Sequence, residues 1–350
     1  IDSNSQKIAK ESMMEELFNY DKRHGWREPT NYANLFNKEQ IESLQNLNLE
    51  FLRDEQYKDN DDLYENNITN TLSKIFENHS YYKGYIKGLV INVDGDQIAI
   101  INESFGINLV SWTNEYSWAR KRIAINDYGP KPKNFYDMLN IGDFIYLKDN
   151  ENFFTIDQIP VAESSLISIN PRSGEVIAYI GGKNFYDSSF DRVRLSYPQS
   201  GSSFKPFIYS AALNDGYNLS TLINDAPLVF EDENLEGAWR PQNYTGEFYG
   251  PISLREALTK SVNIVSIKLL RELGIDKTHN FLENFGFQKS RLPSDLSLAL
   301  GSGNFSPVEM SRAYSVIATN GYIPDIYYID SIKDRDGNII FSHDDNNIQK

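Results

Sequence analysis

The sequence contains no cysteine, only four histidines and no long apolar run. Without cysteine there can be no disulfide and no thiolate metal site. The histidines lie far apart and lack the spacing of metal ligands, so we expect no zinc site. A transmembrane helix needs about 18 or more consecutive apolar residues, and no such stretch is present. The 350 residues suffice for two domains, or for one domain with an insertion.

Clustered positive charge is also scarce. The chain has 34 Lys and Arg against 49 Asp and Glu, for a net charge of −15. The one basic triplet is Arg120-Lys121-Arg122, for which we expect a solvated loop or strand edge. Because nucleic-acid surfaces need clustered Lys and Arg to neutralise phosphates, we expect no nucleic-acid partner.

The first 80 residues are mostly helical in pattern. Residues 6–20 place apolar side chains near helical spacing, which predicts one amphipathic helix. Residues 39–53 predict another, and the acidic stretch Asp59–Asp62 predicts an exposed turn or loop.

From Tyr81 the pattern changes to period two. Runs 85–93 and 97–101 flank Asp94-Gly95, and runs 144–148 and 153–156 flank residues 149–152. Each pair predicts a hairpin, and the set of short strands predicts a small β-barrel over about 80–160.

The remainder alternates helices with turns, after one more hairpin formed by residues 164–169 and 175–180. Predicted helices cover residues 203–214, 253–273 and 307–319, each followed by a glycine suited to a helix C-terminus. A last hairpin is predicted for residues 327–333 and 338–341. The fold class is therefore α+β.

Serine needs a neighbouring base before it can act as a nucleophile. In Ser-x-x-Lys on a helix the two side chains share a face, and burial can lower the lysine pKa until the amine acts as a base. Two matches occur, Ser80-Tyr-Tyr-Lys83 and Ser202-Ser-Phe-Lys205. Ser80 precedes a strand-like run, where i and i+3 point to opposite faces. Ser202 opens a helix, either as nucleophile or simply as its N-cap.

Three Ser-x-Asn matches provide a possible second element. They are Ser168-Ile-Asn170 at a hairpin end, Ser302-Gly-Asn304 in a glycine-rich loop, and Ser261-Val-Asn263 in a helical run. In the third, the Ser261 hydroxyl could relay a proton to a leaving amine while the Asn263 amide holds a substrate carbonyl.

Five segments, in this order, resemble those of class A penicillin-binding proteins. They are Gln199-Ser-Gly-Ser-Ser-Phe-Lys-Pro-Phe207, Trp239-Arg-Pro-Gln-Asn243, residues 250–263, Leu298-Ala-Leu-Gly-Ser302, and Ser306-Pro-Val-Glu-Met310 with Asn320-Gly321. One match would be weak, whereas five in order are specific. Tyr20-Asp-Lys-Arg-His-Gly-Trp-Arg27 resembles the segment before the OB-like insert of the Gram-negative 1A type.

The resemblance implies a domain plan. Residues 1–30 are expected to be a linker and the start of a transpeptidase domain. Residues 31–160 are expected to be an insert with an OB-like β-domain. Residues 161–350 are expected to form the rest of a penicillin-binding, serine β-lactamase-like transpeptidase domain. A membrane anchor and a glycosyltransferase domain are expected upstream, with the whole protein in the bacterial inner membrane facing the periplasm.

The resemblance also implies the chemistry. Ser202 would be acylated by the D-Ala-D-Ala end of a stem pentapeptide, with Lys205 as base. Ser261 would pass the proton to the leaving amine, and Asn263 would bind the substrate amide. No metal or organic cofactor is needed. β-Lactams would stall the enzyme as an acyl form, and an outer-membrane lipoprotein activator could bind the OB-like insert.

One departure from the family pattern is serious. The third family element, Lys-Ser/Thr-Gly, supplies an oxyanion-hole strand and recognises the substrate carboxylate, and the sequence has no such triplet. We therefore expect the transpeptidase domain to be incomplete at its C-terminus and the chain to be a poor or inactive transpeptidase. Two alternatives remain, a serine β-lactamase-like hydrolase and a non-catalytic cell-wall scaffold.

Overall fold

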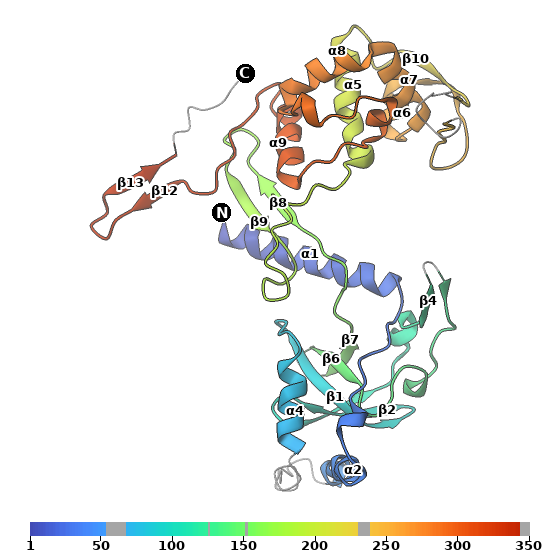
Figure 1. Cartoon of the computed structure of the whole chain (residues 1–350), viewed down its shortest axis with the longest axis vertical. Coiled ribbons are helices and arrows are strands. Elements are labelled where there is room, and N and C mark those ends of the chain that lie inside the picture. The colour runs from blue at the N-terminus through green and yellow to red at the C-terminus, as the bar shows by residue number, and fades with distance from the viewer. Residues whose placement is uncertain (54–67, 125–126, 151–152, 230–238, 344–350) are drawn as a thin grey trace. The chain divides into compact units, whose positions relative to one another are not determined.

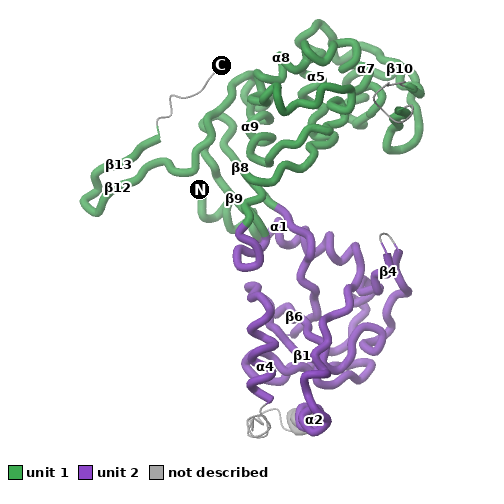
Figure 2. The backbone as a smooth tube through the Cα atoms, in the orientation of Figure 1, with its two compact units in different colours: residues 1–10, 165–182, 190–350 green, residues 11–164, 183–189 purple. Residues whose placement is uncertain are grey.

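The computed structural model describes the chain except residues 54–67, 125–126, 151–152, 230–238 and 344–350, with backbone alone for 47–53. The predicted turn at Asp59–Asp62 therefore lies outside the described residues. Two compact units make up the chain (Figure 2). Unit 1 contains residues 1–10, 165–182 and 190–350, and unit 2 contains residues 11–164 and 183–189. Among the described residues, no helix is long and apolar enough to cross a membrane.

Helix α1, Ser3–Arg23, extends the helix predicted for residues 6–20 at both ends. Its first turns, through Lys10, belong to unit 1 and the remainder belongs to unit 2. The buried apolar side chains are Met13, Leu17 and Phe18, and their spacing of four and one places them on one side of the helix. The helical periodicity of the sequence thus marks the buried face.

Unit 2 is built on a five-stranded antiparallel sheet in the order β3-β2-β1-β6-β7 (Figure 1). The edge strands β3 and β7 approach each other, as in a partly closed barrel. The strands are β1 Tyr85–Asp94, β2 Gln97–Asn102, β3 Ile107–Ser111, β6 Phe144–Asp149 and β7 Phe154–Asp157; the short β4 Arg122–Ala124 and β5 Asp127–Tyr128 pair separately.

Both faces of the central strands are buried. Val90 packs in one core cluster with Trp26 and Phe135, whereas its neighbours Leu89 and Ile91 pack in another. This second cluster includes side chains of α2, Lys38–Arg53, and α4, Ile68–Glu77. Because successive strand residues point to opposite faces, a strand buried on both sides reads as a continuous apolar run.

The first predicted hairpin forms, but its turn is shifted by one residue. Asp94 pairs with Gln97, so the two turn residues are Gly95 and Asp96, not Asp94 and Gly95. With Asp94 paired to Gln97, Val93 lies opposite Ile98. The shift preserves the alternation that buries Ile98 and Ile100, and this side-chain register outweighs the local turn preference.

The segment Lys183–Ser189, which follows strand β9, Val176–Ile180, belongs to unit 2. Lys183 Nζ donates to Pro160 O at 2.8 Å, and Asn184 Nδ2 donates to Tyr81 O at 3.2 Å. The Tyr82 hydroxyl donates to Asp187. The boundaries expected for the insert were 30/31 and 160/161. The second compact unit instead contains residues 11–164 and 183–189. The contacts that bring residues 183–189 to unit 2 join positions more than 20 residues apart in sequence.

The described part of unit 1 combines three two-stranded sheets, β8-β9, β10-β11 and β12-β13, with helices α5–α9 (Figure 1). The Phe204 and Phe207 side chains are fully buried in its main hydrophobic core. The helices are α5 Lys205–Asn214, α6 Leu254–Thr259, α7 Asn263–Leu273, α8 Ile275–Leu282 and α9 Pro307–Ala318. The strands are β8 Leu166–Ile169, β9 Val176–Ile180, β10 Leu222–Asp225, β11 Gly250–Ser253, β12 Ser331–Lys333 and β13 Ile339–Ser342.

The prediction of one helix over residues 253–273 is wrong. The segment forms α6 and α7, interrupted at Ser261, whose φ is +53°. A left-handed residue cannot continue a right-handed helix, and serine reaches this conformation only at a cost. The glycine after α7, Gly274, ends that helix as predicted.

Candidate active site

The turn that carries Ser202 is a single 3₁₀ segment, Gly201–Phe204, which leads directly into α5. Pro206 has no N–H, so it cannot donate an α-helical bond to the Ser202 carbonyl. The Lys205 N–H donates to that carbonyl in its place. Side chains three apart eclipse in a 3₁₀ turn, so Ser202 and Lys205 emerge on the same side. The proline of the sequence motif therefore helps to align its serine and lysine.

The segment after Leu300 also holds this turn in place. Ser200 N donates to Gly303 O at 3.0 Å, and Gly201 N donates to Gly301 O at 2.9 Å. Gly301 has φ +78°, and a Cβ there would lie 1.9 Å from Gly201 O. Only glycine allows the two backbones to approach this closely. The Ser302-x-Asn304 match thus lies in the segment that holds the turn. The spacing of the match did not indicate this role.

Lys205 is the most completely buried cationic side chain of the site, with 1% of its surface exposed. Its Nζ donates to three oxygens, Ser261 O at 2.6 Å, Ser261 Oγ at 2.9 Å and Asn263 Oδ1 at 2.7 Å. Burial lowers the pKa of Lys205 to about 8, because removal from water penalises the charged ammonium. A substantial fraction of the amine is therefore neutral near physiological pH.

The helix break places Ser261 beside Lys205. Ser261 is exposed at its side chain, whereas the next residue, Val262, is buried in the core. Because Ser261 has a left-handed backbone, both its carbonyl and its hydroxyl reach the ammonium. A continuous helix would commit that carbonyl to its own i+4 bond.

Asn263 begins α7, and a residue distant in sequence fixes its backbone. Asn243 Oδ1 accepts from Asn263 N at 3.0 Å and from Ile264 N at 3.3 Å, which caps a helix that has no side-chain cap of its own. Asn243 Nδ2 in turn donates to the buried Asp225 carboxylate at 2.9 and 3.1 Å. The Trp239–Asn243 motif could have drawn attention to Asn243, but sequence analysis assigned it no role.

Two family models match this chain. The model described as the penicillin-binding protein transpeptidase domain matches residues 165–350, and the penicillin-binding protein OB-like domain matches residues 56–162. The chain belongs to the penicillin-binding protein transpeptidase family. The prediction of an α+β transpeptidase domain with an OB-like domain is thereby confirmed.

Relatives cover almost all of this transpeptidase-family chain. It is 36% identical to penicillin-binding protein 1A of Pseudomonas aeruginosa and 34% identical to that of Vibrio cholerae, over 97% and 98% of the chain. The chain spans 38% and 39% of those proteins. The crystal structure of penicillin-binding protein 1A from Haemophilus influenzae is similar, with a TM-score of 0.77 and 30% identity over 97% of this chain and 45% of that one.

Within the transpeptidase domain, three of the four predicted side chains converge, namely Lys205, Ser261 and Asn263. Ser202 is exposed one turn before Lys205, and its hydroxyl has no hydrogen bond to that ammonium. The other Ser-x-x-Lys serine, Ser80, lies in unit 2 just before β1.

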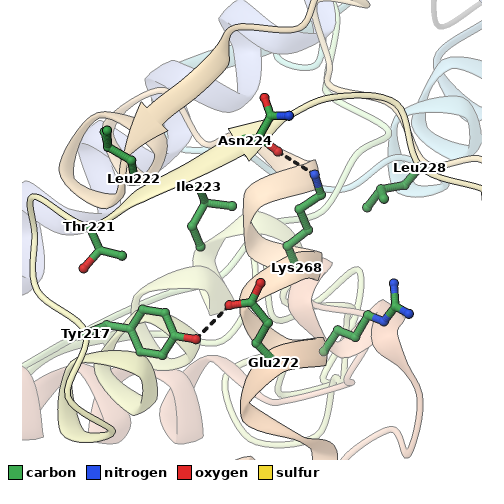
Figure 3. Close-up of a pocket in the computed structure, with 9 residues that line it drawn as sticks. Tyr217, Thr221, Leu222, Ile223, Asn224, Leu228, Lys268 and Glu272 are labelled. Atoms are coloured by element: carbon green, nitrogen blue, oxygen red, sulfur yellow. Dashed lines mark hydrogen bonds between the residues drawn. The ribbon is translucent and has the colours of Figure 1, made fainter.

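A separate pocket of about 510 Å³ lies between β10 and α7 (Figure 3). Lys268 Nζ donates to Asn224 O across it, and the Tyr217 hydroxyl donates to Glu272. None of the four predicted site residues lines this pocket, which is formed by Tyr217, Thr221, Leu222, Ile223, Asn224, Leu228, Lys268, Arg271 and Glu272. It is not the candidate active site.

Proposed function

We propose that this chain carries the nucleophile half of a penicillin-sensitive serine D,D-transpeptidase that cross-links peptidoglycan stem peptides. The observation that carries the proposal is the buried Lys205 ammonium, hydrogen-bonded to Ser261 Oγ and Asn263 Oδ1 one turn after an exposed Ser202. The family model that matches residues 165–350 supports the same class of reaction.

In the acylation step, neutral Lys205 accepts the proton of Ser202 Oγ, and the oxygen attacks the carbonyl carbon between the two D-Ala residues. The C–N bond breaks, an ester to Ser202 forms, and D-Ala leaves. Ser261 passes the proton from Lys205 to the leaving amine, and the 2.9 Å bond between Lys205 and Ser261 supplies that path.

In the second step an amine of a neighbouring stem peptide attacks the ester, and Ser202 regains its proton. Water in place of the amine would give carboxypeptidase activity. A β-lactam would be opened by the same attack, leaving its acyl group on Ser202. The Ser202 N–H, at the start of the 3₁₀ turn and α5, would be one oxyanion donor, since N–H groups there favour developing negative charge.

We expect neither Lys260 nor Lys268 to replace the cation of the third family element. Lys260 is paired with Glu256 at 2.7 Å on the surface of α6, and Lys268 lines the separate pocket. The sequence itself lacks Lys-Ser/Thr-Gly. We therefore expect the 350-residue chain alone to be a poor or inactive transpeptidase.

The whole protein is expected to do more than this chain. By analogy with class A proteins, it would also polymerise glycan strands through a glycosyltransferase domain and be anchored in the inner membrane, facing the periplasm. An outer-membrane lipoprotein activator would bind the OB-like domain of unit 2.

A β-lactamase-like hydrolase is less well supported. The glutamates Glu272 and Glu309 are both engaged elsewhere, Glu272 with Tyr217 and Glu309 in the capping box of α9 with Ser306. Neither occupies the site of Lys205, where a deacylating base would act.

The test is covalent labelling of the full-length protein with a fluorescent penicillin, followed by nitrocefin turnover. We expect a stable label and negligible turnover. Rapid turnover would indicate a β-lactamase, and the absence of label would indicate a non-catalytic scaffold.

A further inference from the structure

One carbonyl within the Ser202 turn has an unusual hydrogen-bond partner. The Tyr314 hydroxyl of α9 donates to Ser203 O at 2.6 Å, from a position 111 residues away. In the 3₁₀ pattern of this turn, Ser203 O would accept from residue 206, but Pro206 has no N–H. Tyr314 donates to a carbonyl that has lost this i+3 partner.

The ring of Tyr314 has a packing contact besides its hydroxyl bond, although 39% of the residue is exposed. It packs edge-on against Phe207 of α5, with ring centroids 5.0 Å apart. α9 itself begins at a full capping box between Ser306 and Glu309. The donor is therefore presented from a packed ring on a well-capped helix, which makes it a geometric restraint on the turn.

The bonded carbonyl lies between the proposed nucleophile and its base. Three peptide units join Ser202 to Lys205. Ser202 O accepts from Lys205 N, and the orientation of the next unit, that of the Ser203 carbonyl, also affects how Ser202 faces Lys205. The start of the turn is held separately, by the carbonyls of Gly301 and Gly303. The turn is thus restrained at Ser200 and Gly201 by one segment and at Ser203 by Tyr314.

We infer that Tyr314 is a positioning residue for the acylation step, which orients Ser202 toward Lys205 by holding the Ser203 carbonyl. The inference rests on the proposed function, in which Ser202 is the nucleophile. Tyr314 touches no reacting atom in this role. Burial raises the pKa of its hydroxyl, so the proton needed for the bond is retained throughout the pH range in which Lys205 titrates.

The test compares Tyr314→Phe with Tyr217→Phe in the full-length protein. Each substitution removes one tyrosine hydroxyl hydrogen bond and keeps the ring, but the Tyr217 bond goes to Glu272 in the separate pocket. Saturation kinetics with a chromogenic β-lactam separate the dissociation constant of the initial complex from the acylation rate constant. Measurements are made well below the unfolding temperature of each variant.

We expect Tyr314→Phe to lower the acylation rate constant about three- to tenfold, as for the loss of one ordinary hydrogen bond, with the dissociation constant unchanged. Tyr217→Phe should alter neither. An unchanged rate constant in Tyr314→Phe, an equal loss in both variants, or a change confined to the dissociation constant would each overturn the inference. Mass spectrometry on the wild-type protein provides the separate check, because failure to find the adduct on Ser202 overturns the proposed function as well.

Discussion

Lys205 Nζ donates to Ser261 Oγ at 2.9 Å, although 56 residues separate the two in sequence. The contact depends on two local departures from regular helix, the 3₁₀ turn before Lys205 and the left-handed Ser261 between α6 and α7. Strained residues of this kind cluster at functional sites, where surrounding structure holds them in place. Both departures therefore serve to assemble the candidate site.

The protonation of Lys205 predicts how acylation depends on pH. Its pKa is lowered by burial to about 8, against 10.5 for an ordinary lysine. The base must be neutral to accept the Ser202 proton, so we expect the acylation rate to rise with pH and level off above an apparent pKa near 8. Stopped-flow labelling with a fluorescent penicillin between pH 6 and 10 tests this. Lys205→Arg, which stays charged, should be nearly inactive at every pH; a flat profile in the wild type would exclude Lys205 as the base.

The adduct should form on Ser202 alone. Ser202 is exposed beside Lys205, whereas the Ser203 hydroxyl donates to Ser200 O within the turn. We expect mass spectrometry of the penicillin-treated full-length protein to find the label on the peptide containing Ser202. Ser202→Ala should abolish labelling, while Ser203→Ala and Ser80→Ala should keep it. A label on Ser80 or Ser203 would contradict the assignment.

Much of the fold could be predicted from the sequence where periodicity and glycine positions agree. The helix ending near Gly216 and the hairpin of β8 and β9 follow from such local patterns, which operate over a few residues. The break at Ser261 was not predicted, because apolar residues continue at helical spacing on both sides of it, although residues 261–265 are weaker helix formers than their neighbours. The left-handed conformation of Ser261 is held by hydrogen bonds from Lys205, which lies on another helix, α5.

The sequence predicted the candidate site residues through residue types at motif spacings. It did not predict the residues that hold them in position. The supporting contacts are made to backbone atoms distant in sequence, by the backbone of Gly301 and by the side chains of Asn243 and Tyr314. Such contacts leave no periodic signal in one sequence. The sequence shows Gly301 as a glycine within the Leu298–Ser302 segment, but it does not show which residue Gly301 contacts. Only the three-dimensional structure shows that a Cβ on Gly301 would lie 1.9 Å from Gly201 O.

The close approach at Gly301 predicts an effect on acylation that a general loss of stability would not produce. Gly301→Ala should displace the Ser202 turn, because the new Cβ would collide with Gly201 O. Misplacement of a reacting group by about 1 Å can cost roughly 10²-fold in rate. Gly321→Ala is the matched control, since Gly321 also has positive φ, +109°, but has nothing within 4 Å of the added carbon.

Both variants should lose about 1–2 kcal/mol from left-handed strain. Acylation should fall strongly only in Gly301→Ala. Equal acylation rates in the two folded variants would show that the turn tolerates the displacement.

Unit 2 is predicted to bind a protein partner and not nucleic acid. A deletion that tests this should begin before Trp26, because Trp26 is 3% exposed and packs in the core of unit 2. In the full-length protein, replacing residues 25–160 by a short linker should remove the activation that we propose for an outer-membrane lipoprotein and leave penicillin acylation intact. Salt-sensitive binding of single-stranded DNA to the intact chain, against its net charge of −15, would contradict the prediction.

The final prediction concerns the missing third element. Acylation needs the carbonyl oxygen held by two N–H groups, and here Ser202 N is the candidate for one of them. Loss of a single oxyanion donor typically costs about 2.7–4 kcal/mol, or a factor of about 10²–10³ in rate. We expect a larger loss in this chain, since the strand with Lys-Ser/Thr-Gly would also supply the cation that binds the substrate carboxylate.

The structure gives that expectation a physical basis. Among the described residues of unit 1, the sheet that contains β8 has β9 as its other strand, with a single bridge from Glu175 to Tyr327. A further strand paired with this two-stranded sheet would extend it as well as complete the site. The deciding measurement compares penicillin acylation by this 350-residue chain with acylation by a version extended through a Lys-Ser/Thr-Gly strand. The extended version should acylate at least about 10²-fold faster and unfold at a higher temperature. Equal rates would mean that Lys205, Ser261 and Asn263 suffice without the third element, and that the oxyanion is held by N–H groups of the Ser202 turn alone.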